Sequence, residues 1–255
     1  MTTYLIHVKT FIDRYEHMQR QFQQVSWNVE LILEGDFNTL SDELVNQLFT
    51  GELNPKTFAT SCAYKHLMTY QRLLNSKEPW ALILEDDVFL APHAEEILAS
   101  IEAEIQQRQL RNWVISLEDT NNQFVPNAQL KKNQFLYATK RGRLTAAYLI
   151  DRAAAQQILD AVQKHKCDYP IDWFQDRLRR QWTLPDFWSS VALARQGSID
   201  GHFNSLISCR KRSNWQQISF HLQRMYKNPK LFSLEFHLGN PGKMQVRFVS
   251  CKYAA

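Results

Sequence analysis

One stretch constrains the fold of this chain more than any other: an apolar run at residues 80–84 that leads into Glu85, Asp86 and Asp87. Successive apolar residues without helical spacing, entered through Pro79, predict a strand that is covered on both faces, as in a mostly parallel sheet. Ligands of open α/β sheets bind beyond the carboxyl ends of the strands. The three carboxylates are therefore expected at the mouth of a cleft.

These three acids predict a metal site. Neighbouring carboxylates repel one another unless a cation joins them. Mn²⁺ or Mg²⁺, bound by one or two carboxylates and by the phosphates of a substrate, would remove the repulsion. We expect Asp87 as a ligand, with Asp86 or Glu85 as its partner. The alternative is an acidic loop exposed to solvent, and the buried strand before it argues against that interpretation.

Length and composition describe an ordered globular protein. With 255 residues and 44% hydrophobic content, the chain can bury a full core as one large domain or as one domain with a small appendage. No apolar run approaches the roughly 18 to 20 residues of a membrane span, and the N-terminus has no signal-peptide pattern, so we expect a cytoplasmic protein. The four cysteines have no zinc-site spacing and are expected as reduced thiols: Cys62, Cys167, Cys209 and Cys251.

The positive charge is concentrated late in the chain. The net charge is only +4, which gives no reason to expect nucleic acid as a partner, but Lys and Arg are in excess from Arg195 onward. Such a basic part could contact an anionic membrane surface at its periphery or an anionic acceptor, and it could equally be an ordinary solvated face.

Apolar periodicity predicts alternating strands and helices, as in a doubly wound α/β domain. A second strand also ends in acids, Glu118 and Asp119, which suggests one carboxylate-lined edge. We expect a catalytic domain at 1–200 and a basic, helical or irregular extension at 201–255 packed on the same domain. Strands are expected at 4–8, 29–33, 80–84, 113–117, 144–150, 191–194 and 244–249, helices at 11–24, 41–49, 57–74, 92–108, 151–162, 173–180 and 215–226, and a loop or hairpin at 120–135.

Several short motifs occur in an order that resembles glycosyltransferase family 25, the bacterial lipooligosaccharide glycosyltransferases related to collagen galactosyltransferases. They span most of residues 4–206 and are Leu5-Ile6-His7-Val8 with Asp13-Arg14 and His17-Met18, Cys62-Ala63-Tyr64-Lys65-His66, Leu84-Glu85-Asp86-Asp87-Val88, Leu117-Glu118, Thr145-Ala146-Ala147-Tyr148 and Pro170-Ile171-Asp172. Two departures bear on the acceptor side: Phe58-Ala59 replaces the usual Gly-Glu, and Leu144 replaces a Gly.

The resemblance implies a GT-A-like fold, a UDP-hexose donor (galactose or glucose), inversion at the anomeric carbon, and an outer-core sugar of lipooligosaccharide or lipopolysaccharide as acceptor. It also implies a metal shell of Asp87 and Asp86 completed by a late histidine, His202 or His221. The donor-side residues implied are His7, Val8, Arg14, Glu85 and Asp86. Arg14 could instead pair on the surface with Asp13 or Glu16.

Inversion needs a general base that takes the proton of the acceptor hydroxyl. Asp172, which follows the Pro170 turn and matches the family position, is the first candidate, and Glu118 and Asp119 come next. Asp172 could instead cap a helix that begins at Trp173.

Other residues allow a structural or a functional interpretation. His66 is expected as a core or near-site histidine rather than a metal ligand. Trp173, Trp182, Phe187 and Trp188 form an aromatic cluster that is core or, through Trp182 and Trp188, lines an acceptor cleft.

Two competing functions remain at this point. A metal-dependent phosphohydrolase would also use carboxylates at strand ends, but no Asp follows the first strand as its nucleophile. A non-catalytic module that binds carbohydrate or a membrane surface would fit the basic tail and the aromatic residues.

Overall fold

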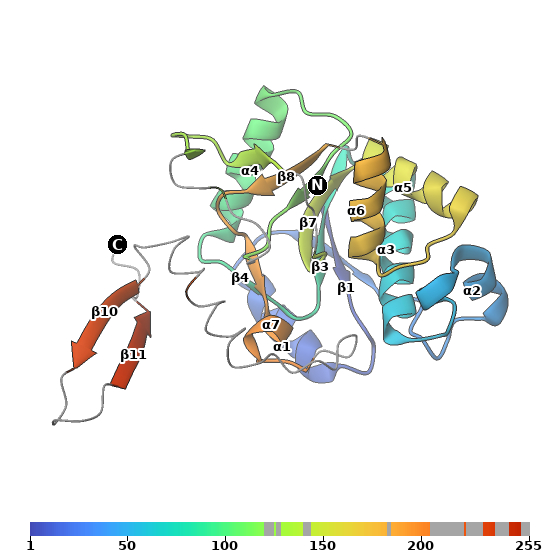
Figure 1. Ribbon diagram of the computed structural model, residues 1–255, viewed down its shortest axis with the longest axis horizontal. Helices are drawn as coiled ribbons and strands as arrows, with labels where there is room; N and C mark the ends of the chain where they lie inside the picture. The colour runs from blue at the N-terminus through green and yellow to red at the C-terminus, as the bar shows by residue number, and fades with distance from the viewer. Residues whose placement is uncertain are drawn as a thin grey trace.

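The computed structural model describes residues 1–119, 125, 129–139, 144–182, 185–204, 222, 232–237 and 245–250. Helices and strands alternate along this part of the chain (Figure 1). The strands are β1 (Thr2–Ile6), β2 (Asn28–Ile32), β3 (Trp80–Glu85), β4 (Val88–Leu90), β5 (Val114–Ser116), β6 (Leu136–Ala138), β7 (Ala147–Asp151), β8 (Asp186–Ser189), β9 (Ala194–Gln196), β10 (Phe232–His237) and β11 (Gln245–Ser250). The helices are α1 (Ile12–Phe22), α2 (Asp42–Leu48), the short 3₁₀ helix η1 (Gly51–Leu53), α3 (Phe58–Asn75), α4 (Ala94–Gln107), α5 (Arg152–His165), α6 (Ile171–Trp182) and α7 (Gly197–Asp200).

Seven strands form a mixed central sheet in the order β2-β1-β3-β7-β5-β8-β6. Strands β2, β1, β3, β5 and β8 point one way, and β7 and β6 run against them. The expected α/β class with a mostly parallel central sheet flanked by helices is therefore confirmed. Because Ile6 pairs with Glu85, β1 and β3 end at the same edge, and the residues that follow them meet there.

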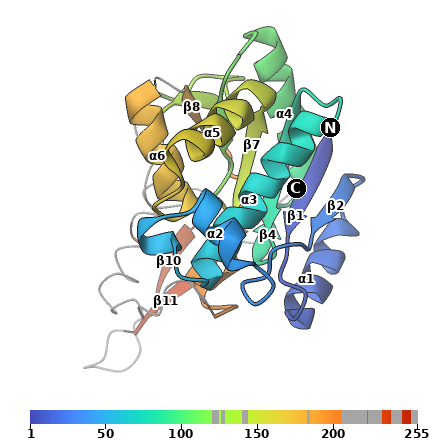
Figure 2. The same ribbon diagram turned by 90° about the vertical axis from the view of Figure 1, so that its right-hand side faces the viewer.

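Helices cover both faces of this sheet. One apolar layer joins the sheet to α2, α3, α5 and α6, and the other joins it to α1 and α4. Figure 2 shows α3 and α5 side by side on the first face. Ile83 belongs to the first layer and Leu82 and Leu84 to the second, and all three are 0% exposed. The prediction of a strand covered on both faces is correct.

Two helix caps follow the sequence pattern. The Ser41 side chain accepts a hydrogen bond from the Leu44 N–H at 3.1 Å at the start of α2. The Asp151 carboxylate accepts one from the Ala154 N–H at 2.8 Å at the start of α5. Each side chain satisfies a backbone donor that the first turn leaves unpaired, which fixes where the helix begins.

The later strands differ from the predictions. After the acidic turn the chain forms β4, which pairs antiparallel with β9, and the strand expected at 191–194 begins only at Ala194. Strand β8 was not predicted, because its sequence Asp-Phe-Trp-Ser has a buried acid and a buried serine instead of an apolar run. The expected strand at 144–150 starts at Ala147.

The C-terminal predictions are mostly untested. Strand β11 matches the strand expected at 244–249, and it pairs with β10 in a separate two-stranded antiparallel sheet. The helix expected at 215–226, apart from residue 222, and most of the loop expected at 120–135 lie outside the described residues. Within the part of the chain that is described, no helix has both the length and the apolar character of a membrane span.

Candidate active site

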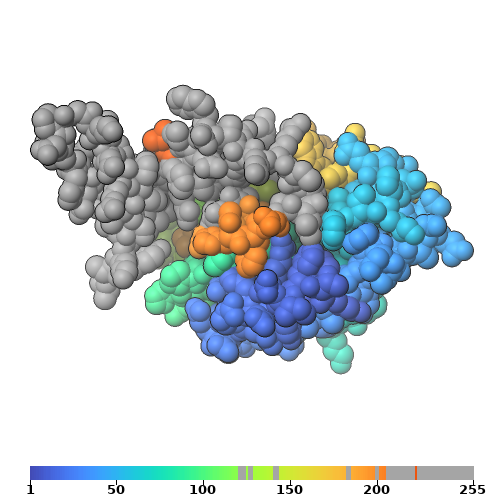
Figure 3. All heavy atoms as spheres, turned by 90° about the horizontal axis from the view of Figure 1, so that it is seen from below, coloured from blue at the N-terminus to red at the C-terminus, as the bar shows by residue number. Residues whose placement is uncertain are grey.

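A pocket opens where β1 and β3 end, and it encloses about 570 Å³ of space, part of it open to solvent. Helices α1 and α3 and the segment around α7 form its other walls. Figure 3 shows the residues near 200, in orange, lying against the N-terminal part of the chain, in blue. The pocket is lined by Ile6, Val8, Phe11, Arg14, Phe58, Ser61, Cys62, Lys65, Glu85, Asp86, Asp87, Gln196 and Ser198.

The Asp86 carboxylate is buried and has a partner on each oxygen. Its Oδ1 accepts a hydrogen bond from Arg14 at 2.7 Å, and its Oδ2 lies 2.8 Å from Nδ1 of His7 and 3.4 Å from the Val8 N–H. Burial alone raises the pKa of Asp86, but the His7 hydrogen bond and the Arg14 charge outweigh it, so the pKa lies below its usual value. Asp86 is therefore a fixed anion. The structure brings His7, Val8, Arg14 and Asp86 together as predicted.

Arg14 connects three segments. Beyond its bond to Asp86, the guanidinium donates to the Asn204 carbonyl at 2.8 Å and stacks over the rings of Phe11 and Phe203, at 5.2 Å and 5.4 Å from their centroids. It forms no ion pair with the two acids of its own helix that the alternative interpretation named. Arg14 thus faces the pocket.

The Asp87 carboxylate, in contrast, is held on one side only. Its Oδ2 accepts a hydrogen bond from the Ser198 N–H at 3.2 Å, while its Oδ1 is buried without a hydrogen-bond partner. Burial and the charge of Glu85 raise the pKa of Asp87 to about 6. The Gly197 N–H donates to the Asp87 carbonyl at 2.7 Å, so the start of α7 fixes the backbone as well.

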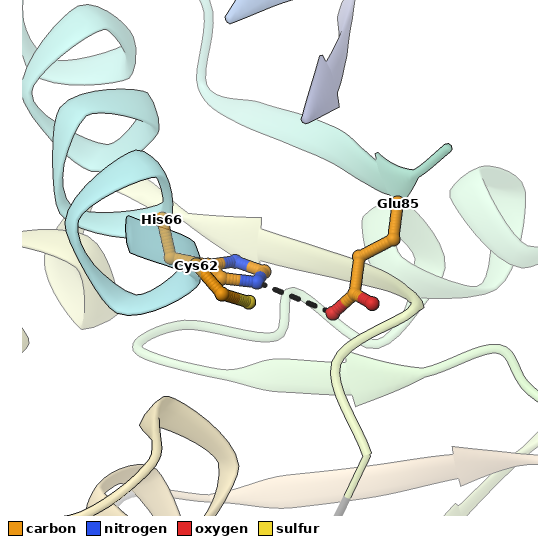
Figure 4. Close-up of side chains that lie close together, drawn as sticks. All are labelled: Cys62, His66 and Glu85. Atoms are coloured by element: carbon orange, nitrogen blue, oxygen red, sulfur yellow. Dashed lines mark ion pairs between the residues drawn. The ribbon is translucent and has the colours of Figure 1, made fainter. Parts of the chain in front are cut away.

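Glu85 contacts the adjacent wall of the pocket. Its Oε1 accepts a hydrogen bond from the Thr145 hydroxyl at 3.2 Å and lies 3.5 Å from Nε2 of His66 (Figure 4). His66 is 0% exposed on α3, as expected of a histidine in the core or beside the site. Cys62 lies one turn earlier on the same helix and also faces Glu85.

The carboxylates fit a hard divalent cation. Asp87 Oδ1 is a buried acceptor with no donor, and the two charges that raise its pKa, those of Glu85 and Asp86, are relieved by a cation. Both Asp86 oxygens already have donors. Of the two partners left open by the sequence, Glu85 is therefore the more available.

The histidine predicted to complete the metal shell is only partly described. His202 follows α7, and its ring packs against Phe89 with centroids 4.9 Å apart. In the described part, the one group of three potential ligands whose atoms lie within 4.8 Å of one another is Cys62, His66 and Glu85, and His202 is not in it. The other candidate, His221, lies outside the described residues.

The three candidate bases occupy different environments. Glu118 is 2% exposed, its Oε1 accepts hydrogen bonds from the N–H groups of Ala146 and Ala147, and burial together with the charge of Glu85 raises its pKa well above the usual value. Asp119 is half-buried.

Asp172 is half-buried in the first turn of α6, which begins at Ile171, so it is not the N-cap that the alternative interpretation required. After burial and the charge of Glu85, Asp172 is the next cause that raises the pKa of Cys62. The charge of Asp172 therefore acts on a residue of the pocket wall.

Trp188, one of the two tryptophans expected to line an acceptor cleft, does not do so. Phe187 and Trp188 lie on β8 and are 7% and 4% exposed, so the core interpretation is correct for both. Trp173 is 47% exposed beside Asp172. The side chain of Trp182 lies outside the described residues.

Sequence reasoning missed the contribution of α7. A Cβ on Gly197 would lie 2.7 Å from the Asp87 carbonyl oxygen and 2.8 Å from the rings of Phe89 and Phe203. Only glycine allows this close approach. The chain has only seven glycines in 255 residues, so each one suggests a position where the backbone needs glycine. The sequence did not show which residue Gly197 approaches.

Comparison with known proteins identifies the family of this chain. The sequence model of glycosyltransferase family 25 (LPS biosynthesis protein) matches residues 1–175, more than half of the chain. The chain therefore belongs to glycosyltransferase family 25 and is a glycosyltransferase of lipopolysaccharide biosynthesis. A solved structure, mouse xyloside xylosyltransferase 1 in its apo form, is similar at 13% identity over 72% of this chain and 70% of that chain, with a TM-score of 0.33. No curated protein sequence matches the chain.

Proposed function

We propose that the protein transfers a hexose, galactose or glucose, from a UDP-sugar to a terminal outer-core sugar of lipooligosaccharide or lipopolysaccharide, with inversion at the anomeric carbon. One observation carries the proposal: Asp86 is satisfied by Arg14 and His7, whereas its neighbour Asp87 presents an unpartnered buried oxygen in the same pocket. The first carboxylate is suited to orienting donor-side groups and the second to binding a cation that accompanies a diphosphate.

Asp87, with Glu85 or Asp86 as partner, would hold Mn²⁺ or Mg²⁺. Such an ion supplies Lewis-acid stabilisation of the charge that develops on the departing nucleotide. His202 as a further ligand stays a prediction. His7, Val8 and Arg14 line or border the same edge and would bind the nucleotide-sugar there.

Asp172 is the proposed general base. It is half-buried and its charge acts on Cys62 in the pocket wall, which supports a role in taking the proton of an acceptor hydroxyl. Glu118 is less suited to this role, because it is only 2% exposed and its Oε1 is held by two backbone donors. We place the enzyme at the cytoplasmic face of the inner membrane, where a basic C-terminal part would meet anionic lipid.

The experiment that tests this function is a thermal-shift series with UDP, UDP-galactose, UDP-glucose and the GDP counterparts, each with Mn²⁺ or with a chelator. A ligand at one hundred times its Kd adds about 2.7 kcal/mol of stability. We expect a shift that is selective for UDP, depends on Mn²⁺ and is lost in Asp87→Asn. The exposed Asp42 offers the matched control, Asp42→Asn, which should behave as wild type.

Failure would have a clear form. If no nucleotide shifts the melting temperature with or without Mn²⁺, the donor and metal assignments are wrong. If GDP-sugars give the larger shift in melting temperature, the pocket is still the donor site, but uracil is the wrong nucleobase for the donor.

A further inference from the structure

Cys62, His66 and Glu85 bring three different ligand types together on one wall of the pocket (Figure 4). Cys62 and His66 are four residues apart on α3, so they lie on the same face of the helix, and Glu85 is the last residue of β3. Their sulfur, nitrogen and oxygen atoms all lie within 4.8 Å of one another. Thiolate, imidazole and carboxylate together suit Zn²⁺ rather than Mg²⁺ or Ca²⁺.

The His66 ring is an independent observation that points to a ligand. Nε2 is fully buried, has no hydrogen-bond partner, and is directed at Glu85 from 3.5 Å. The other ring nitrogen, Nδ1, lies 2.8 Å from the hydroxyl of Tyr148, which is itself 2.6 Å from the hydroxyl of Tyr70. Histidine ligands of metals characteristically have their second nitrogen fixed in this way.

We propose that Cys62, His66 and Glu85 form a Zn²⁺ site with three protein ligands and a fourth position that faces the pocket. Zinc sites with three protein ligands keep such an open position for water or a substrate group. Cys62 and Glu85 both line the pocket, so an ion between them is reachable from solvent. Glu85 is also a proposed partner of Asp87 for Mn²⁺, so the two sites share one carboxylate. The Zn²⁺ assignment itself rests on the three clustered ligands and not on the proposed sugar transfer.

Charge favours a cation at this place. The carboxylates of Glu85, Asp172, Asp86 and Asp87 all act on the Cys62 thiol, and together with burial they raise its pKa well above the usual value. A thiol must lose its proton to bind a metal, so binding of Zn²⁺ by Cys62 would be pH-dependent. The ion then offsets part of the repulsion between the thiolate and these carboxylates.

The hydrogen bonds behind His66 are compatible with coordination. Coordination uses the Nε2 lone pair, so the ring proton is on Nδ1 and is donated to Tyr148. Tyr148 then donates to Tyr70, whose hydroxyl oxygen also accepts a hydrogen bond from the Gln175 amide nitrogen at 2.5 Å.

Co²⁺ is the probe, because a cobalt–thiolate bond gives a charge-transfer absorption band in the near ultraviolet. We expect the band in the full-length wild-type protein and its loss in Cys62→Ser. The matched control is Cys167→Ser, since Cys167 is a buried thiol that donates to the Tyr169 carbonyl and is not one of the three clustered ligands. Asp87→Asn should keep the band, which separates this site from the proposed Mn²⁺ site.

Zn²⁺ competition supplies the affinity. Zn²⁺ should displace Co²⁺ and abolish the band, whereas an excess of Mg²⁺ should not. Tyr148→Phe should weaken Zn²⁺ binding by roughly 10- to 100-fold, as loss of a group that orients a ligand does. Absence of a thiolate band in the wild type, or a band that persists in a folded Cys62→Ser protein, would overturn the proposal.

Discussion

Arg14 donates a hydrogen bond to Asp86 over 2.7 Å, and this buried ion pair joins helix α1 to the acidic turn after β3. The side chains of Arg14 and Asp86 are only 16% and 7% exposed. The Asn204 carbonyl accepts a second hydrogen bond from the same guanidinium, so one side chain connects the first helix, the acidic turn and the segment after α7. The geometry of the pocket therefore depends on contacts between residues up to 190 positions apart.

The first prediction concerns this ion pair. Among the described residues, Arg14→Ala leaves His7 as the only side-chain partner of the buried Asp86 carboxylate, and we expect a loss of about 3 kcal/mol in the free energy of unfolding. Arg72→Ala is the control, because Arg72 pairs with Glu30 and Glu34 at the surface and its loss should cost less than about 1 kcal/mol. Urea denaturation measures both. Equal losses would contradict the role of Arg14.

Gly197 allows a second prediction. Gly197→Ala forces a Cβ to within 2.7 Å of the Asp87 carbonyl oxygen, so α7 must shift and the hydrogen bond from Ser198 to Asp87 is disturbed. We expect a loss of roughly 1 to 3 kcal/mol in stability, together with loss of Mn²⁺-dependent turnover.

Gly201→Ala serves as the control for Gly197→Ala. Its Cβ would meet nothing within 4 Å, but the residue has φ +82°, so about 1 kcal/mol of strain is expected without loss of turnover. A Gly197→Ala enzyme as active as Gly201→Ala would show that α7 does not organise the site.

A third prediction follows from Asp186. Burial raises the pKa of Asp186 to about 7, although the Arg179 guanidinium, 3.3 Å away, acts in the opposite direction. Because the native state binds this proton more tightly than the unfolded state, the contribution of Asp186 to stability falls as the pH rises from about 4 to about 7. Asp186→Asn should therefore gain stability relative to wild type over that range, by roughly 2 to 4 kcal/mol. Unfolding curves at several pH values test this, and a difference that does not change with pH is the contrary result.

The proposed base gives the fourth prediction. Asp172→Asn should lower kcat by roughly 100-fold or more while the Kd for UDP stays unchanged, because only proton removal is lost. The exposed Asp160 on α5 provides the matched variant, Asp160→Asn, which should keep full turnover. The rate of UDP release from the UDP-sugar measures kcat, and a binding titration with UDP measures the Kd. Unchanged turnover in Asp172→Asn would move the role to Glu118 or Asp119.

Much of the fold could be predicted from the sequence, because its signals are local. The apolar run before Glu85 required a strand covered on both faces, and Ser41 and Asp151 marked the starts of two helices. Strand β8 was missed for the same reason. Asp186 and Ser189 are polar yet buried, and their burial depends on the pairing of β8 with β5 and β6, which lie far earlier in the chain and which no local pattern reveals.

The sequence by itself determined that Glu85, Asp86 and Asp87 follow a buried strand at a sheet edge, and its ordered motifs pointed to the correct family. Only the tertiary structure decided which carboxylate is satisfied and which is not. Asp86 receives Arg14 and His7, while Asp87 keeps a free oxygen. Asp86 and Asp87 have the same side-chain chemistry, and only packing gives each its own hydrogen-bond donors and its own burial. That packing is set by strand register and by the contacts of helices that lie far away in the sequence.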